Sequence, residues 1–190
     1  MLAICFSFVL GPLIWLPLLL VVFIIKTNLT HDQIRVLFPI VFIFQILIPL
    51  LYIAAAYKLK KIHDLDMSKK EERIIPLIIS TIALFISLVV IKFTGSPMLF
   101  HLFMLLSILL FLNGIITIFW KISFHMGINV VSTLLVNFLY HWQFPILYLA
   151  IPAIYWSRLK LHKHTRGQLI AALVLNASII FIFLKIYQYI

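Results

Sequence analysis

Long runs without a charged side chain dominate this sequence. Residues 122–157 contain no Lys, Arg, Asp or Glu over 36 positions, and residues 1–25 contain none either. An apolar helix of about 20 residues crosses the ~30 Å hydrocarbon layer of a bilayer. Across the 190 residues, 65% of the side chains are hydrophobic and 11% are charged, whereas soluble domains have about 45–50% and about 25%. A soluble globular fold is therefore excluded, and an integral membrane protein is predicted.

Cutting the chain at its charged residues predicts about six to seven spans in an all-α, polytopic transmembrane helical bundle. The hairpin within residues 122–157 provides two of them, because the polar residues 141–143 interrupt that run. Residues 1–57 are expected to form two N-terminal transmembrane helices, and residues 58–190 the remaining core of a single membrane domain. The spans are 1–25, 36–57, 74–91, 93–120 with a turn at 95–97, the hairpin, and 167–190.

The predicted spans place most of the positive charge on one side of the membrane. The chain has 15 Lys and Arg against 5 Asp and Glu, and the segments 58–73, 119–125 and 157–166 together hold 11 of these 15 basic residues. If each span crosses once, the three segments share a side. Such a cluster marks either an anion site at helix ends or topology-setting charges in loops, and charge alone does not decide. The single cysteine, Cys5, excludes a disulfide framework.

The most specific motif lies between the sixth and seventh predicted spans. Ser157 and Arg158 are followed after five residues by His164, and after three more by Gln168. This spacing resembles the third signature motif of the type 2 phosphatidic acid phosphatase superfamily, the lipid-phosphate phosphatases related to vanadium haloperoxidases. That motif is Ser-Arg, five residues, His, three residues, Asp. Ser157, Arg158 and His164 fit it, while Gln168 stands where the family has Asp.

Two other segments resemble the remaining motifs of this family less closely. Ser123 and His125 match the Ser and the His of its second motif, Pro-Ser-Gly-His, but the Pro and the Gly are replaced. Arg73 stands for the Arg of its first motif, which is Lys, six residues, Arg-Pro. Asp66 occupies the position of the Lys, and the Pro is displaced to Pro76. The resemblance covers roughly residues 60–190 and is closest to a divergent prokaryotic branch.

The resemblance implies a helical core that carries a phosphatase site. In this family the His of the third motif attacks phosphorus to give a phosphohistidine, so His164 is the implied nucleophile. The His of the second motif implies His125 as the acid that protonates the leaving group and the base that activates water. The chemistry of the family needs no metal or other cofactor, and none is expected. The expected phosphate ligands are Arg158, Arg73, Ser123, Lys121 and Ser157.

Gln168 has two interpretations that do not exclude each other. His164 and Gln168 are four residues apart and share a face at a helix start, so the amide oxygen can accept the Nδ1 proton of His164 and hold its tautomer. The second interpretation is a capping box in which Thr165 and Gln168 open the last span. Another capping box is predicted at Ser68 and Glu71, before the third span.

The expected function is an integral membrane phosphatase for a lipid phosphomonoester or pyrophosphate, such as phosphatidic acid, phosphatidylglycerol phosphate, an isoprenyl pyrophosphate or a lipid A phosphate. Its expected partners are this substrate and membrane lipids, not nucleic acid. The alternative is a non-catalytic relative, or an unrelated membrane binding or transport protein. The expected location is the cell inner membrane. The 11-to-4 charge distribution favours a cytoplasmic site, whereas Lys26 and Arg35 beside the first span favour the opposite side.

Overall fold

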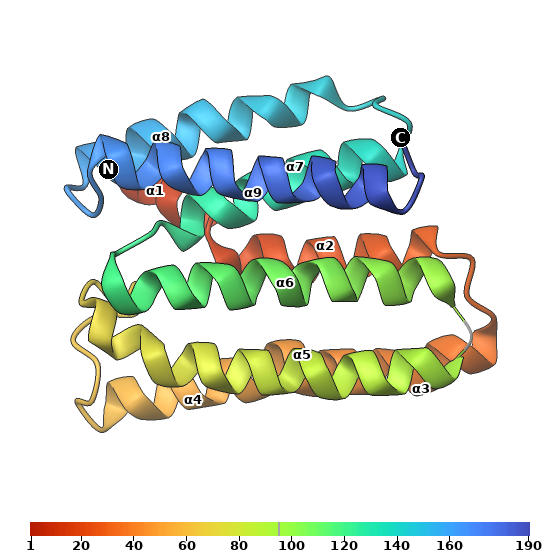
Figure 1. Cartoon of the computed structure of the whole chain (residues 1–190). Helices are drawn as coiled ribbons and strands as arrows, with labels where there is room; N and C mark the ends of the chain where they lie inside the picture. Colours follow the sequence, from red (N-terminus) through yellow and green to blue (C-terminus); the bar gives the residue numbers. More distant parts are fainter. Residues whose placement is uncertain (95) are drawn as a thin grey trace. The chain divides into compact units, whose positions relative to one another are not determined.

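The computed structural model describes residues 1–94 and 96–190, which form helices and no strand (Figure 1). The all-α prediction is confirmed for these residues. Gly95, in the predicted turn at 95–97, lies outside the described residues. The α-helices are α1 (Leu2–Val9), α2 (Pro12–Lys26), α3 (His31–Val41), α4 (Ile48–Lys58), α5 (Ile74–Thr94), α6 (Pro97–Phe119), α7 (Phe124–Leu139), α8 (Ala150–Lys160) and α9 (Arg166–Ile186). A π-helix, η1 (Phe42–Leu47), and two 3₁₀-helices, η2 (Lys70–Arg73) and η3 (Pro145–Leu149), are also present.

Within residues 1–94 and 96–190, five helical segments are long and apolar enough to cross a membrane, as expected of a multi-pass membrane protein. They correspond to the first four predicted spans and the last one: Leu2–Lys26, His31–Lys58, Lys70–Phe93, Pro97–Phe119 and Arg166–Ile186.

The predicted hairpin within residues 122–157 forms the shorter helices α7 and α8, with a turn at residues 140–142. With 16 residues, α7 is about 24 Å long, which is shorter than the ~30 Å hydrocarbon layer. The extended segment before Phe124 takes up residues that the sequence pattern assigns to a span. The fifth and sixth spans therefore stay a prediction.

The helices group into two compact units. Unit 1 comprises Met1–Val22 and Lys121–Ile190, and unit 2 comprises Phe23–Trp120. This grouping differs from the predicted division after residue 57, because α1 packs against α8, which is far away in the sequence. The second and third motifs lie in unit 1, and Arg73 lies in unit 2.

In unit 2, α5 contacts α6, α3, η1 and α4. The π-helix η1 precedes Pro49, which has no N–H to donate to the carbonyl of Gln45 one turn earlier. A wider π turn accommodates this missing bond. Gln45 is buried, and its Nε2 donates to Ser87 Oγ on α5 at 2.9 Å. Because an unsatisfied amide in an apolar layer is costly, this bond fixes η1 against α5.

In unit 1, α7 is the inner helix: most of its residues are buried, and α8 and α9 pack against it. Three of its buried polar side chains donate to carbonyls of the preceding turn. Asn129 Nδ2 donates to His125 O at 2.7 Å, Thr133 Oγ1 donates to Asn129 O at 2.7 Å, and Asn137 Nδ2 donates to Thr133 O at 3.0 Å. These bonds allow a polar helix to lie among apolar ones. The helix carries His125 in its first turn.

Gly127 allows α7 to pack closely against α9. A Cβ on Gly127 would lie 3.2 Å from Asn176 Nδ2 on α9, whereas a Cβ on Gly114 of α6 would meet no atom within 4 Å. We expect Gly127→Val to lower the free energy of unfolding by about 1–3 kcal/mol, because the added methyl groups force the two helices apart. Thermal unfolding in detergent measures this, with Gly114→Val as the matched control. Equal losses in the two variants would contradict it.

Candidate functional site

The connection from α8 to α9 explains the spacing of the third motif. The helix α8 ends in a Schellman turn, in which Lys163 N donates to Arg158 O at 3.1 Å and His162 adopts a left-handed conformation with φ of 52°. Only Lys163 and His164 then precede Thr165, the N-cap of α9. The five residues between Arg158 and His164 therefore form one helix end and one turn. They place both side chains at the same end of unit 1.

Both predicted contacts of Gln168 are present. Gln168 N donates to Thr165 Oγ1 at 3.3 Å, and Thr165 N donates to Gln168 Oε1 at 3.1 Å, which completes the capping box. The same Oε1 lies 3.1 Å from His164 Nδ1. Because the N–H of Thr165 can only donate, the shared atom is the amide oxygen, which can only accept. His164 Nδ1 therefore carries the proton, and the lone pair of the neutral imidazole is on Nε2.

The second motif lies at the start of α7. Ser123 is the N-cap of this helix, and its Oγ accepts from Met126 N at 3.3 Å. His125 is partly buried in the first turn. Lys121 Nζ donates to Lys163 O at 2.9 Å, which ties the segment before α7 to the turn before α9. The second and third motifs therefore meet at one end of unit 1.

Arg158 and Ser157 are buried against α1. The side chain of Arg158 is 1% exposed, and its Nη1 donates to Ser7 Oγ at 2.6 Å. Ser157 Oγ donates to Ala3 O at 2.7 Å, so this predicted phosphate ligand holds α1 against α8 in the structure. His164 is also buried, with 7% exposed.

Unit 1 contains positive but no acidic side chains, because all five Asp and Glu residues of the chain lie between residues 32 and 72. A buried charge is costly unless a partner compensates it. No carboxylate side chain of unit 1 can compensate Arg158. The N-termini of α7 and α9 lie at the same end of unit 1 as Arg158. Their free N–H groups and helix dipoles, together with the positive side chains, favour a bound anion there. The six basic residues of the unit are Lys121, Arg158, Lys160, Lys163, Arg166 and Lys185.

Arg73, the residue of the first motif, lies in η2 of unit 2 and is 5% exposed. Its Nε donates to Met67 O at 2.7 Å, and its Nη2 donates to Asp66 O at 3.5 Å. Its guanidinium therefore holds the loop that precedes it. That Arg73 binds the same phosphate as Arg158 stays a prediction.

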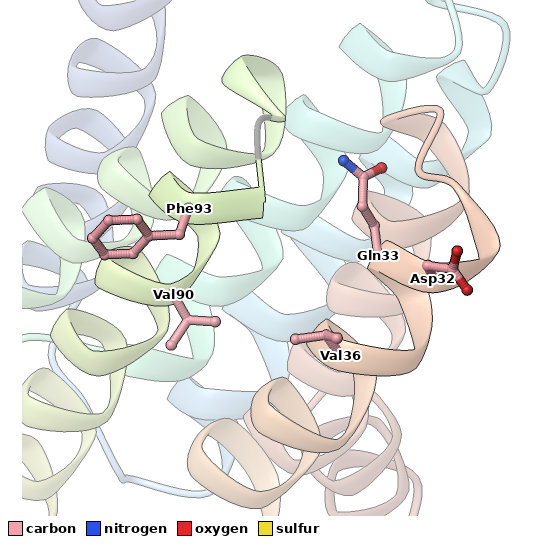
Figure 2. A pocket seen from close by; sticks show the side chains of 5 residues that line it. All are labelled: Asp32, Gln33, Val36, Val90 and Phe93. Atoms are coloured by element: carbon pink, nitrogen blue, oxygen red, sulfur yellow. The ribbon is translucent and has the colours of Figure 1, made fainter.

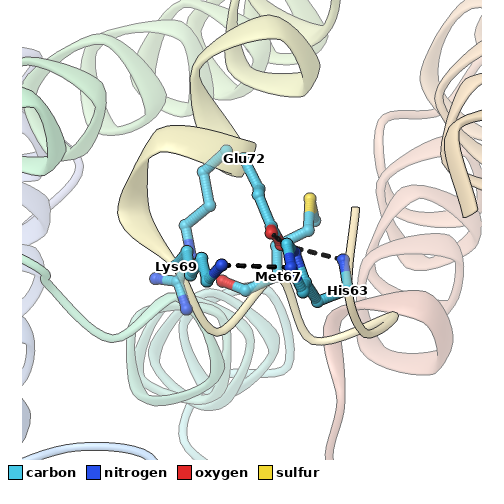
Figure 3. Close-up of polar contacts among 5 residues, drawn as sticks. His63, Met67, Lys69 and Glu72 are labelled. Carbon is cyan, nitrogen blue, oxygen red and sulfur yellow. Dashed lines mark hydrogen bonds and ion pairs between the residues drawn. The ribbon is translucent and has the colours of Figure 1, made fainter. Parts of the chain in front are cut away.

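His63 also holds this loop (Figure 3). Its Nδ1 lies 2.5 Å from Glu72 Oε1, and its Nε2 lies 3.1 Å from Lys69 Nζ. The predicted capping box at Ser68 and Glu71 is wrong: Lys69 occupies the N-cap of η2, with no side-chain cap bond. The residues before α5 form the 3₁₀-helix η2, which is wound more tightly than an α-helix. In this turn the carboxylate of Glu72 contacts His63 in the preceding loop.

Other kinds of site have less support in the structure. Across residues 1–94 and 96–190, no group of three or more His, Cys, Asp or Glu side chains could hold a metal ion.

An open pocket lies in unit 2 between α3 and α5 (Figure 2), and it contains none of the predicted site residues. The carboxylate of Asp32, which lines this pocket, makes the pocket unsuitable for an anion. Its lining residues are Asp32, Gln33, Val36, Val90 and Phe93.

No protein-family model, curated protein or solved structure matches this chain. Its function is therefore inferred from the side chains at the end of unit 1 and from the motifs that place them there.

Two residues beside this site, Ser7 and Gly11, are absent from the sequence-based prediction. A Cβ on Gly11 would lie 3.5 Å from His125 Nε2, and Ser7 binds Arg158. A signal for them exists in the sequence, since Ala3, Ser7 and Gly11 repeat a small residue every four positions. In membrane helices this spacing marks a closely packed face.

Proposed function

We propose that the chain is an integral membrane phosphatase that hydrolyses a lipid phosphomonoester or pyrophosphate at the end of unit 1. The observation that carries this proposal is that a short turn at the end of α8 connects buried Arg158 to His164. His164 Nδ1 in turn contacts Gln168 Oε1. A guanidinium that binds phosphate oxygens and an imidazole with its lone pair on Nε2 are the groups that phosphoryl transfer to histidine requires.

In the first step, the Nε2 lone pair of His164 attacks phosphorus. The N–P bond forms while the P–O bond to the lipid alcohol, or to the lipid phosphate of a pyrophosphate, breaks. The leaving oxygen takes a proton from His125. Arg158 and Lys121 bind the negative charge on the phosphoryl oxygens.

In the second step, water attacks the phosphohistidine. His125, now neutral, accepts a proton from this water, the P–N bond breaks, and inorganic phosphate leaves. His164 returns to the tautomer with its proton on Nδ1, next to Gln168 Oε1. Ser123 supports both steps by capping α7, whose first N–H groups favour an anion.

A lipid substrate is favoured by the surroundings of the site. Among the described residues, five helical segments are long and apolar enough to span a membrane. The helix α1, which covers Arg158, exposes Leu2, Ile4 and Phe8. Such a surface suits an acyl or isoprenyl chain that remains among lipids while its phosphate reaches the site.

The test is phosphate release by the purified protein from phosphatidic acid, phosphatidylglycerol phosphate, an isoprenyl pyrophosphate and a lipid A phosphate, with glycerol 3-phosphate as the soluble ester. We expect release from at least one lipid and loss of that release in His164→Ala. A wild-type protein that releases no phosphate from any of them would favour the non-catalytic alternative. Release from glycerol 3-phosphate alone would overturn the lipid specificity.

Gln168→Glu is expected to raise kcat, by roughly tenfold. The carboxylate can still accept from Thr165 N and His164 Nδ1, and it stabilises the positive imidazole ring that forms when His164 is phosphorylated. The acidic limb of the pH–rate profile should also move to higher pH, because the carboxylate favours protonated His164, which cannot attack. Rates of phosphate release between pH 4 and pH 9 measure both effects. The matched control is Gln168→Met, which removes both contacts and should lower kcat. A faster Gln168→Met would contradict the role of Gln168.

A further inference from the structure

The N-terminal helix α1 binds the two residues that begin the third motif. Its buried face carries Ala3 and Ser7, which are 7% and 8% exposed. Ala3 O accepts from Ser157 Oγ, and Ser7 Oγ accepts from Arg158 Nη1 at 2.6 Å. The guanidinium of Arg158 therefore takes part of its orientation from a helix about 150 residues earlier in the chain.

The turn after α1 reaches the second motif. Asn129 Nδ2 of α7 donates to Leu10 O at 2.7 Å, and this bond fixes the break between α1 and α2. At the next residue, Gly11, a Cβ would lie 3.5 Å from His125 Nε2. The same short N-terminal segment thus lies against both Arg158 and His125.

The type of acceptor at Ser7 matters for an anion site. A hydroxyl oxygen is neutral, so it can fix the direction of a guanidinium without cancelling its positive charge. A carboxylate in the same place would form an ion pair with Arg158 and compete with phosphate for the same donors. Unit 1 contains no Asp or Glu at any position, so no carboxylate side chain of this unit competes with phosphate for Arg158.

We propose that Ser7 is a positioning residue of the phosphate site: its hydroxyl orients Arg158 for the phosphoryl group while leaving the guanidinium fully charged. The helix α1 is then part of the site as well as a membrane segment. This inference rests on the proposed function, because it takes Arg158 as a phosphate ligand.

The test compares Ser7→Asp with Ser7→Asn, two side chains of nearly equal size that differ by one charge. The probe is inorganic phosphate, whose dissociation constant is obtained from the rise in melting temperature that it causes, and whose inhibition constant is obtained from lipid phosphate hydrolysis. We expect Ser7→Asp to weaken phosphate binding by about tenfold or more through its ion pair with Arg158, and Ser7→Asn to stay within about threefold of wild type. Equal phosphate binding by the two variants would overturn the proposal.

A second pair of variants keeps the test decisive if the aspartate variant does not fold. Ser7→Ala removes the acceptor and should raise KM for the lipid phosphate several-fold with little change in kcat, while Ser7→Thr, which keeps a hydroxyl, should restore KM. An unchanged kcat/KM in Ser7→Ala, or no rescue by Ser7→Thr, would overturn the proposal. Cys5→Ser, on the exposed side of α1, should leave both constants unchanged.

The phosphatase mechanism and the role of Ser7 are tested by different variants. If His164→Ala releases phosphate as fast as wild type, the proposed phosphatase mechanism falls whatever the Ser7 variants do. If His164→Ala is inactive and the Ser7 variants bind phosphate equally, only the role of Ser7 falls.

Discussion

Replacing His164 with Ala is expected to abolish phosphate release from every lipid phosphate that the wild-type protein hydrolyses, with a fall in kcat/KM of at least about 10³-fold. The substitution removes the only atom proposed to bond to phosphorus. The fold should survive, because the capping box of α9 uses Thr165 and Gln168 and not the imidazole. Phosphate release and the melting temperature, measured on the same preparation, separate a lost nucleophile from a lost fold.

The matched control is His162→Asn. His162 is exposed in the same turn and has a positive φ, which Asn tolerates well, so activity should be unchanged. His125→Ala is the complementary variant: it keeps the nucleophile and loses the group that protonates the leaving oxygen and activates water, so an aryl phosphate, whose leaving group needs no proton, replaces the lipid phosphate as its substrate. After brief exposure to substrate labelled on phosphorus, it should retain acid-labile label that His164→Ala lacks. Equal labelling of His125→Ala and His164→Ala would contradict the phosphohistidine.

Arg158→Lys is expected to lower kcat/KM by about 10- to 100-fold although the charge is kept. The planar guanidinium can bind Ser7 and phosphate oxygens through different N–H groups, whereas an ammonium is a point charge on a flexible stem. Most of the loss should appear in KM if the contact is equally strong in the ground state and the transition state, and in kcat if it strengthens during transfer. Steady-state rates on the preferred lipid phosphate distinguish the two.

Arg166→Lys is the matched control for this variant. It makes the same substitution at the same end of unit 1, but Arg166 is exposed at the first position of α9. We expect its kcat/KM to remain within about twofold of wild type, as for most surface substitutions. A similar loss in both variants would mean that the general positive potential matters rather than a bound guanidinium.

Local sequence patterns predicted the features that depend on neighbouring residues. Uncharged runs predicted the apolar helices, and Thr165 and Gln168 predicted the start of α9. Caps are predictable because the side chain and the N–H that it satisfies are three residues apart. The same pattern failed at Ser68, because the helix start lies one residue later: Lys69 is the N-cap of η2.

Features that depend on distant parts of the chain were not predictable in this way. The docking of α1 on α8 needs Ser7 and Arg158, which are 151 residues apart, and no local pattern reports such a pair. The packing of η1 against α5 similarly depends on Gln45 meeting Ser87, 42 residues later. The motif spacing predicted Arg158 and His164 as site residues, and the tertiary structure showed their packing partners. The burial of Ser157 beneath α1 came from the same source.

A single oxygen, Gln168 Oε1, serves two purposes: it accepts the N–H that starts α9 and it contacts the Nδ1 of His164. Fraying of the first turn of α9 would therefore release the imidazole to exchange its tautomer and turn its Nε2 lone pair into an N–H. Ends of helices open with far less free energy than whole domains. On heating, activity would then be lost before the helices themselves melt, and it would return fully on cooling.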